Sequence, residues 1–359
     1  MRVVVSAVAL LISSSALAGP EHARSYEGTA GPTRIVLTVE GEDAGEVWGR
    51  YFYQSSRRDI AVQGTRQGED LVLEARYTGD RLALRTEGST LVGSLTTAAK
   101  RRFPVRLTRV TAAAAVPAAA PAGLSLHERL QLAGLRLEPQ ARESIDGKPI
   151  RWFGEAKSGV RLFRVEGGYS PPALAAMNAA LTRNQWREVH QSLGCTGADG
   201  RAGLDAGVGG RPWLGARYVS YRWRANWDCA GAAHPDFGVA GYSFDARTGR
   251  ELSLDAVLPA GAAPAPRQDS DAWYGYRSKV FAPAVVAALG RYHPAEMQPA
   301  PADGGDDCNY ADPDVWAFPA WQLTPKGLWL GASFPRVVRA CDNPDWSTLP
   351  WSALAVPSK

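Results

Sequence analysis

The chain has 359 residues, of which 45% are hydrophobic and 21% are charged, a balance typical of globular proteins and not of disordered ones. Its 40 basic and 36 acidic residues give a net charge of +4 and are mixed along the sequence, which argues against nucleic acid as a partner. The length suits two domains better than one.

The first 18 residues have the pattern of a secretory signal peptide. Arg2 precedes a mostly apolar run over residues 3–12, and the small-x-small triplet Ala16-Leu17-Ala18 marks a cleavage point. No cysteine follows that point to carry a lipid, and no later apolar run approaches the roughly 18 residues that a membrane-spanning helix needs. We therefore expect a periplasmic or secreted protein without a transmembrane segment in the mature chain.

Residues 24–110 predict an all-β domain. Short alternating segments recur about every ten residues, and most of them end at a turn signal. Leu82 and Leu84 share one face of such a segment, while Arg81 and Arg85 share the other. The predicted strands cover 34–39, 47–53, 59–63, 71–75, 81–85, 90–95 and 103–107. A meander with one apolar face buries that face by curling into a small barrel or sandwich.

Residues 111–123 read TAAAAVPAAAPAG and predict an exposed linker, because they offer no amphipathic face and contain two prolines. Beyond the linker, residues 124–359 predict an α+β domain with an antiparallel sheet. Residues 124–137 carry a short amphipathic stretch, and helices are expected at 170–193 with Ser170 as N-cap and at 270–292. Strands are expected at 160–165, 218–227 and 237–244, a turn at 245–249, and a closing hairpin at 320–323 and 328–332.

The four cysteines all lie after the linker, and an even number in a secreted chain predicts two disulfides among three possible connectivities. We favour Cys195–Cys229 and Cys308–Cys341, each of which closes a loop of roughly 33 residues. The alternative is a redox or metal site. There is no CxxC, and no histidine has ligand spacing to another ligand, so structural bridges are the better interpretation.

Of the 12 tryptophans, all but Trp48 follow residue 150. Aromatic rings in excess of what one core needs can line a groove that recognises glycan or protein, although ordinary core packing is the simpler explanation for any single one. His234 follows a cysteine and a turn of small residues, where a histidine that only bonds the local backbone is the alternative. The candidate binding residues are His234, Trp227, Trp273 and Tyr276.

Two further patterns resemble functional motifs and fall short of them. The segment 241–245 lacks the second glycine of a nucleophile elbow and lies in a predicted strand. A loop around Cys308 carries five aspartates whose spacing differs from that of a calcium-binding loop, so we expect a solvated loop. These aspartates are Asp303, Asp306, Asp307, Asp312 and Asp314. We expect no metal and no cofactor.

The stretch 219–254 combines a strand, the turn Gly-Ala-Ala-His-Pro at 231–235, and a second strand that ends in Phe244 and Asp245 before Thr248 and Gly249. With the later segments 323–328 and 349–354, it resembles the extracytoplasmic domain of lysozyme-binding anti-sigma factors and the accessory domain of some peptidoglycan deacetylases. The resemblance covers about residues 145–355, while the N-terminal β domain resembles no family known to us. It implies an envelope-facing α+β module that recognises protein or cell wall without catalysis.

This chain lacks the transmembrane helix and the sigma-binding segment of the anti-sigma pattern, and also the catalytic domain of the deacetylases. We therefore expect a binding module for cell-wall glycan or a lysozyme-like envelope protein. The first alternative is an envelope hydrolase of an unrecognised type that uses Asp or Glu together with His234, and the second is a purely structural role in the envelope. Paired carboxylates around a deep cleft would favour the hydrolase, and a shallow aromatic groove would favour the binding module.

Overall fold

A computed structural model describes residues 23–261, 264–299 and 308–356. The predicted signal peptide, residues 1–18, lies outside the described residues, as do Asp303, Asp306 and Asp307. The chain divides into two compact units. Unit 1 comprises residues 1–135, 193–203 and 229–232, and unit 2 comprises residues 136–192, 204–228 and 233–359. Unit 1 thus extends past the predicted linker and takes in two later loop segments.

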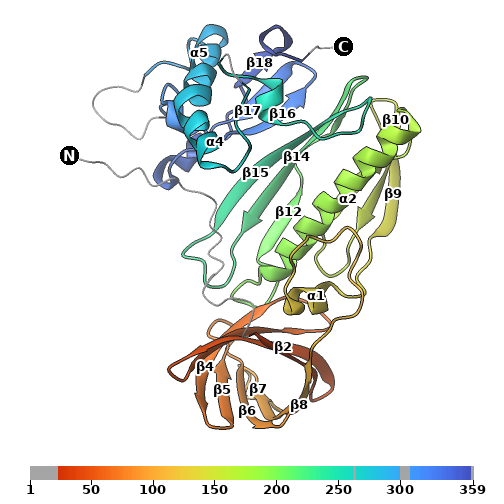
Figure 1. Cartoon of the computed structure of the whole chain (residues 1–359), viewed down its shortest axis with the longest axis vertical. Coiled ribbons are helices and arrows are strands. Elements are labelled where there is room, and N and C mark those ends of the chain that lie inside the picture. The colour runs from red at the N-terminus through yellow and green to blue at the C-terminus, as the bar shows by residue number, and fades with distance from the viewer. Residues whose placement is uncertain (1–22, 262–263, 300–307, 357–359) are drawn as a thin grey trace, which may run out of the picture. The chain divides into compact units, whose positions relative to one another are not determined.

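Unit 1 is built on a closed antiparallel barrel whose strands follow chain order, drawn in red to orange in Figure 1. The strands are β1 (Arg24–Ala30), β2 (Thr33–Asp43), β3 (Glu46–Tyr53), β4 (Ile60–Gln67), β5 (Asp70–Glu74), β6 (Arg81–Glu87), β7 (Thr90–Thr96) and β8 (Arg102–Val110). β8 pairs with β1 and closes the sheet, so no strand edge is left open. The expectation of an all-β domain that closes on itself is confirmed, as a barrel.

The barrel interior is a packed apolar core. Along β2, Ile35, Leu37 and Val39 point into this core, as period-2 alternation requires. The outward-facing Val36 of the same strand is buried as well, because it packs with Phe52 and with Leu130 of helix α1 (Leu126–Leu132). A capping box formed by Ser125 and Glu128 begins α1. The helix therefore covers the outer face of β2 and β3.

The described part of unit 2 contains three antiparallel sheets together with helices. This confirms the predicted α+β class with antiparallel strand pairing. The first orders β11 (Arg161–Val165), β10 (Lys148–Gly154) and β9 (Glu138–Ile145). The second joins β12 (Leu204–Val208), β13 (Trp213–Leu214), β14 (Tyr218–Trp227) and β15 (Asp236–Asp245). The third orders β16 (Ala320–Thr324), β17 (Gly327–Gly331) and β18 (Thr348–Pro350).

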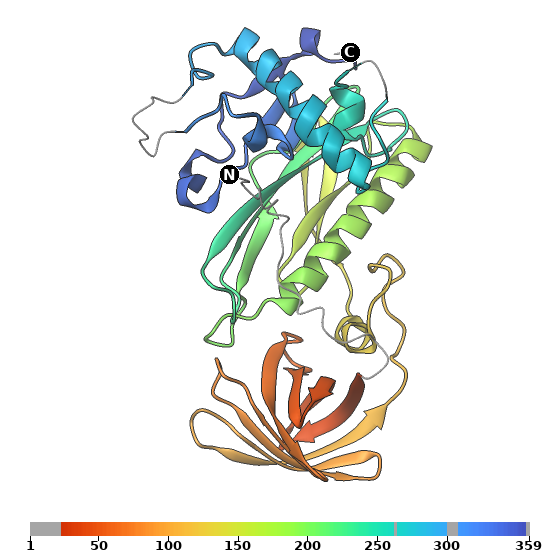
Figure 2. The same ribbon diagram turned by 60° about the vertical axis from the view of Figure 1, so that its left-hand side comes forward.

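Helix α2 (Pro171–Gly194) lies against the first two sheets, as both ribbon views show (Figures 1 and 2). Gln185 donates to the carbonyl oxygen of Phe153 at 2.7 Å, and Asn184 donates to the hydroxyl of Tyr221 on β14 at 3.3 Å. The predicted helix at 170–193 and the predicted strand at 218–227 are therefore confirmed to within one residue.

The predicted helix at 270–292 is confirmed over residues 271–292, with a π-helical segment inside it. It comprises α4 (Asp271–Tyr276), the π-helical segment (Arg277–Phe281) and α5 (Ala282–Tyr292), and the residues at both junctions keep right-handed helical φ and ψ. Pro283 has no N–H to bond a carbonyl oxygen one turn back, and the preceding residue, Ala282, bonds the carbonyl oxygen of Arg277 five residues back. The helix therefore continues through this proline with a changed hydrogen-bond pattern before it. Short helices also occur at α3 (Leu254–Val257), Pro313–Trp316, Arg336–Cys341 and Trp351–Ala353.

The disulfides are Cys195–Cys229 and Cys308–Cys341, the pairing that the sequence favoured. The first joins two loop segments of unit 1, and the second lies within unit 2. Two disulfides are compatible with a secreted protein. In the described ranges, no helix combines the length and the apolar character that crossing a bilayer requires.

Candidate functional site

The candidate residues Trp227 and His234 lie at the β14–β15 hairpin. Trp227 ends β14, where it pairs with Asp236, and it is partly buried. His234 is exposed, and its Nδ1 is bonded to the guanidinium of Arg336. A guanidinium can only donate, so Nδ1 of His234 is the accepting atom of this contact. His234 therefore makes a side-chain contact with a cation rather than with a carboxylate.

The other two candidates, Trp273 and Tyr276, lie on α4. The hydroxyl of Tyr276 accepts a hydrogen bond from the backbone N–H of Ala260 at 3.3 Å, and its ring packs against the core of unit 2. Tyr276 is thus mainly a packing residue. Within the described ranges, no hydrogen bond or ring contact connects Trp273 or Tyr276 with Trp227 or His234, so the four candidates form two separate groups.

Trp273 belongs to an exposed group of rings, here called the aromatic patch and composed of Trp273, Tyr274 and Phe318. The ring centroids of Trp273 and Tyr274 lie 5.2 Å apart, and each ring lies within 6 Å of the ring of Phe318. Tyr274 is 48% exposed and Phe318 is 43% exposed, although large apolar side chains are usually covered. The patch therefore presents two rings to solvent over a partly buried tryptophan.

The guanidinium of Arg277 lies close to two rings of the aromatic patch. Its side chain is buried, donates to the carbonyl oxygen of Ala317 at 2.7 Å, and pairs with Asp255 at 2.8 Å. Its guanidinium carbon lies 5.4 Å from the ring centre of Trp273 and 5.6 Å from that of Phe318, within the range of cation–π attraction. Burial lowers the pKa of Arg277, and the charge of Asp255 opposes that shift.

Asp255 fixes the orientation of the supporting groups. One carboxylate oxygen accepts from Arg277, and the other accepts from the indole N–H of Trp273 at 2.9 Å. Both the tryptophan and the arginine are thereby held by a single carboxylate, so their rotamers are restricted before any ligand arrives. Preorganised rings lose little conformational entropy when they bind a ligand. The π-helical segment places Arg277 in this position, and such segments are frequent at functional sites.

Sequence reasoning identified Trp273 but not Tyr274 or Phe318. Phe318 lies between a short helix and β16, far from α4 in sequence, and no local pattern connects the two elements. The signal that was available was composition, because aromatic residues are abundant after residue 150. Composition predicts that an aromatic surface exists, whereas its location depends on the tertiary fold.

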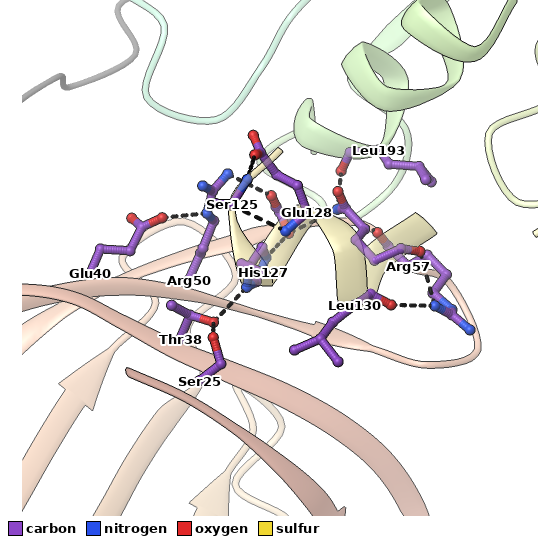
Figure 3. Close-up of polar contacts among 12 residues, drawn as sticks. Ser25, Thr38, Glu40, Arg50, Arg57, Ser125, His127, Glu128, Leu130 and Leu193 are labelled. Carbon is purple, nitrogen blue, oxygen red and sulfur yellow. Dashed lines mark hydrogen bonds and ion pairs between the residues drawn. The ribbon is translucent and has the colours of Figure 1, made fainter. Parts of the chain in front are cut away.

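A second polar arrangement, in unit 1, resembles a catalytic relay. Figure 3 shows His127 of α1 between strand residues and the chain segment that follows β3. Its Nδ1 lies 2.8 Å from the hydroxyl of Thr38, which in turn lies 2.8 Å from the hydroxyl of Ser25. Its Nε2 lies 2.7 Å from Asp59, which also pairs with Arg50 at 3.1 Å. We call these five residues the His127 network.

The His127 network is a structural element. Thr38, His127 and Asp59 are 2%, 1% and 7% exposed, so no substrate atom can reach the hydroxyl. The ring is also oriented opposite to that of a serine protease triad, in which the carboxylate bonds Nδ1 and the nucleophile bonds Nε2. Gln131 of α1 donates to Asp59 at 2.9 Å as well. The network therefore attaches α1 to the barrel.

The described part of the chain contains no arrangement of side chains typical of a metal site. Within those ranges, no group of three or more His, Cys, Asp or Glu side chains is arranged to hold an ion. In the predicted aspartate loop, Asp312 caps the short helix Pro313–Trp316, and its carboxylate accepts from the backbone N–H of Asp314 at 2.9 Å. Asp312 therefore has a local structural role.

Neither a protein-family model nor a curated protein matches the chain. The resemblance of residues 145–355 to lysozyme-binding anti-sigma factors and to deacetylase accessory domains therefore stays a prediction, and the aromatic patch is the feature that best indicates a function.

Proposed function

We propose that this chain is a periplasmic or secreted recognition module without catalytic activity. Its ligand is cell-wall glycan, with a lysozyme-like envelope protein as the alternative ligand. The observation that carries this proposal is the aromatic patch, in which Tyr274 and Phe318 are exposed and the adjoining ring of Trp273 is fixed by its hydrogen bond to Asp255. Rigid exposed rings are the groups on which sugar faces stack and on which protein interfaces concentrate their binding energy.

Two further features support a binding role. His234, which the hydrolase alternative requires, is exposed and bonded to a cation. The most relay-like group, the His127 network, is closed to solvent. Both disulfides fit an oxidising compartment, where cell-wall glycan is an accessible ligand.

The test is a binding assay with the oxidised chain from Gly19 onward. We expect the protein to co-sediment with purified peptidoglycan or to be retained by immobilised lysozyme. The double substitution Tyr274→Ala and Phe318→Ala should weaken that binding at least about ten-fold, since each ring is a candidate hot spot. The matched control is Tyr292→Ala, which removes a tyrosine that is 36% exposed elsewhere in unit 2.

The comparison of binding to peptidoglycan with binding to immobilised lysozyme identifies the ligand class. A glycan ligand gives binding to peptidoglycan alone, and a protein ligand gives binding to lysozyme. Retention that the double substitution leaves unchanged would contradict the assignment of the aromatic patch. Release of soluble fragments from peptidoglycan by the protein would instead support the hydrolase alternative.

A further inference from the structure

A cavity of about 320 Å³ lies at one end of the barrel in unit 1. Its walls include Tyr53 at the end of β3, Thr78 and Asp80 from the β5–β6 connection, and Asp199 from the disulfide-linked segment 193–203. The volume falls at the lower end of the range for small-molecule sites. We call this cavity the mouth pocket.

Covalent and backbone bonds join the segment 193–203 to the loop segment 229–232, and a backbone bond joins it to the chain that follows β3. Cys195 is bonded to Cys229, and the N–H of Ala230 donates to the carbonyl oxygen of Thr196 at 2.7 Å. The N–H of Asp59 donates to the carbonyl oxygen of Leu193 at 2.9 Å. The wall that Ala198 and Asp199 contribute is therefore formed before a ligand binds.

Asp80 is the distinctive residue of the mouth pocket. Its side chain is 9% exposed, and one carboxylate oxygen, Oδ2, accepts from the hydroxyls of Tyr51 at 2.5 Å and of Tyr53 at 3.4 Å. Burial raises the pKa of Tyr51, which keeps that hydroxyl protonated as a donor. Within the described ranges, Oδ1 of Asp80 has no hydrogen-bond donor, and no Lys, Arg or His forms an ion pair with Asp80.

Asp80 lies in the lining of the mouth pocket, and its Oδ1 is left for a donor that a ligand supplies. A cationic donor on the ligand would form a charge-assisted hydrogen bond there. A bare metal ion does not fit this description, since the described residues provide no cluster of three ligating side chains. An ammonium group needs fewer ligands and donates hydrogen bonds directly.

The rest of the lining indicates what else the ligand carries. Ser56 adds a hydroxyl and Asp199 a second carboxylate to the lining, which also includes Arg58, and both groups suit a ligand that carries an ammonium group and hydroxyls. Tyr53 adds an aromatic ring on which the face of a sugar can pack. We propose that the mouth pocket binds a small hydroxylated amine, of the amino-sugar class, with its ammonium group on Asp80. This site lies in a different unit from the aromatic patch and does not depend on the proposed function.

The experiment is isothermal titration of the oxidised protein with D-glucosamine and with N-acetyl-D-glucosamine, at about pH 6, where an amine is protonated. Acetylation removes the positive charge and retains the hydroxyls. We expect saturable binding of glucosamine that is at least about ten-fold tighter than binding of the acetylated sugar, because a charge-assisted hydrogen bond is lost. Equal affinity for the two sugars, or no saturable binding of glucosamine, would overturn the proposal.

Two variants and a control locate the site. Asp80→Asn removes the charge with little change of shape, and Ala198→Leu fills the pocket from an exposed loop position without contact with the barrel core. Each should weaken glucosamine binding at least about ten-fold. Asp70→Asn, at the start of β5 and thus at the opposite end of the barrel, should leave it unchanged. If Asp80→Asn fails to fold, the affinity of the Ala198→Leu variant for glucosamine tests the proposal instead. Unchanged glucosamine binding by a folded Ala198→Leu protein would exclude the mouth pocket as the binding site.

Discussion

At the scale of single residues, Asp59 is the position on which unit 1 depends most. It accepts from Arg50, His127 and Gln131, which come from β3 and α1. Asp59→Ala leaves the buried Nε2 of His127 without its partner, whereas Arg50 keeps its ion pair with Glu40 and Gln131 keeps two carbonyl acceptors. We expect the free energy of unfolding of unit 1 to fall by about 3–5 kcal/mol, the range for removal of one partner of a buried ion pair.

Urea unfolding monitored by hydrogen exchange in β2 and α1 measures this loss. The control is Glu69→Ala, which removes an exposed carboxylate from a surface pair with Arg85 and should leave the unfolding midpoint unchanged. A decrease of less than about 1 kcal/mol for Asp59→Ala would mean that water replaces the missing acceptor.

Glu188 gives the chain a pH-dependent stability of definite sign. It lies on α2, and burial raises its pKa above the ordinary value of 4.5, while the charge of Arg187 partly opposes the shift. A carboxyl that binds its proton more tightly when folded favours the folded state at low pH. Its contribution is lost as the pH rises from the unfolded pKa through the folded pKa.

Glu188→Gln removes this dependence and keeps the shape of the protonated side chain. We expect the variant to be more stable than the wild type at about pH 7 and equally stable at about pH 4, as measured by urea midpoints. A variant that is less stable at neutral pH would show that the ionised Glu188 is favourably paired in the folded protein.

At the scale of elements, Gly241 determines how closely β15 approaches β16. A Cβ atom at this position would lie 1.6 Å from the carbonyl oxygen of Trp321, so the two backbones could not keep their spacing. Gly241→Ala should lower the free energy of unfolding by about 1–3 kcal/mol through overpacking. Gly290 in α5 offers the matched control, because an added Cβ meets no atom there.

Gly290→Ala should instead raise the free energy of unfolding by about 0.5–1 kcal/mol, since alanine loses less backbone entropy in a helix interior. Thermal unfolding followed by circular dichroism checks both variants. If both variants changed the free energy of unfolding in the same direction, the close approach of β15 and β16 would not be the reason for glycine at position 241.

Elements with a regular local pattern could be predicted from the sequence. The alternation of Leu82 and Leu84 with charged neighbours predicted β6, and Ser170 before Pro171 predicted the start of α2. Strand β1 was missed, because few of its residues are apolar and its buried Ser25 is satisfied only by the hydroxyl of Thr38. The π-helical segment that precedes α5 lies next to Pro283, and a helical pattern of apolar residues does not reveal it.

The sites were harder to predict than the elements, because they join residues that are distant in the sequence. His127 meets Thr38 and Asp59 only after α1 has packed on the barrel. Phe318 meets Trp273 in the same way, through the tertiary fold. Trp273 was identified because tryptophan is conspicuous in a sequence, whereas an aspartate such as Asp80 acquires its character from burial between two tyrosines.

At the scale of the whole molecule, each unit has its own apolar core and its own disulfide. Trp48 is the one tryptophan whose sequence position falls in unit 1, and the others fall in unit 2. Tryptophan fluorescence therefore reports mainly on the folding of unit 2, while hydrogen exchange in the barrel strands reports on unit 1.

Removal of one disulfide at a time tests whether the two cores unfold independently. Cys308→Ser with Cys341→Ser should destabilise the fluorescence-detected transition by roughly 3–4 kcal/mol, the loop-entropy value for a separation of 33 residues. Cys195→Ser with Cys229→Ser should leave that transition in place and accelerate exchange in residues 193–203, because the Cys195–Cys229 bond joins segments of unit 1 only. An equal shift of the fluorescence transition by both double variants would show instead that the two cores unfold as one cooperative system.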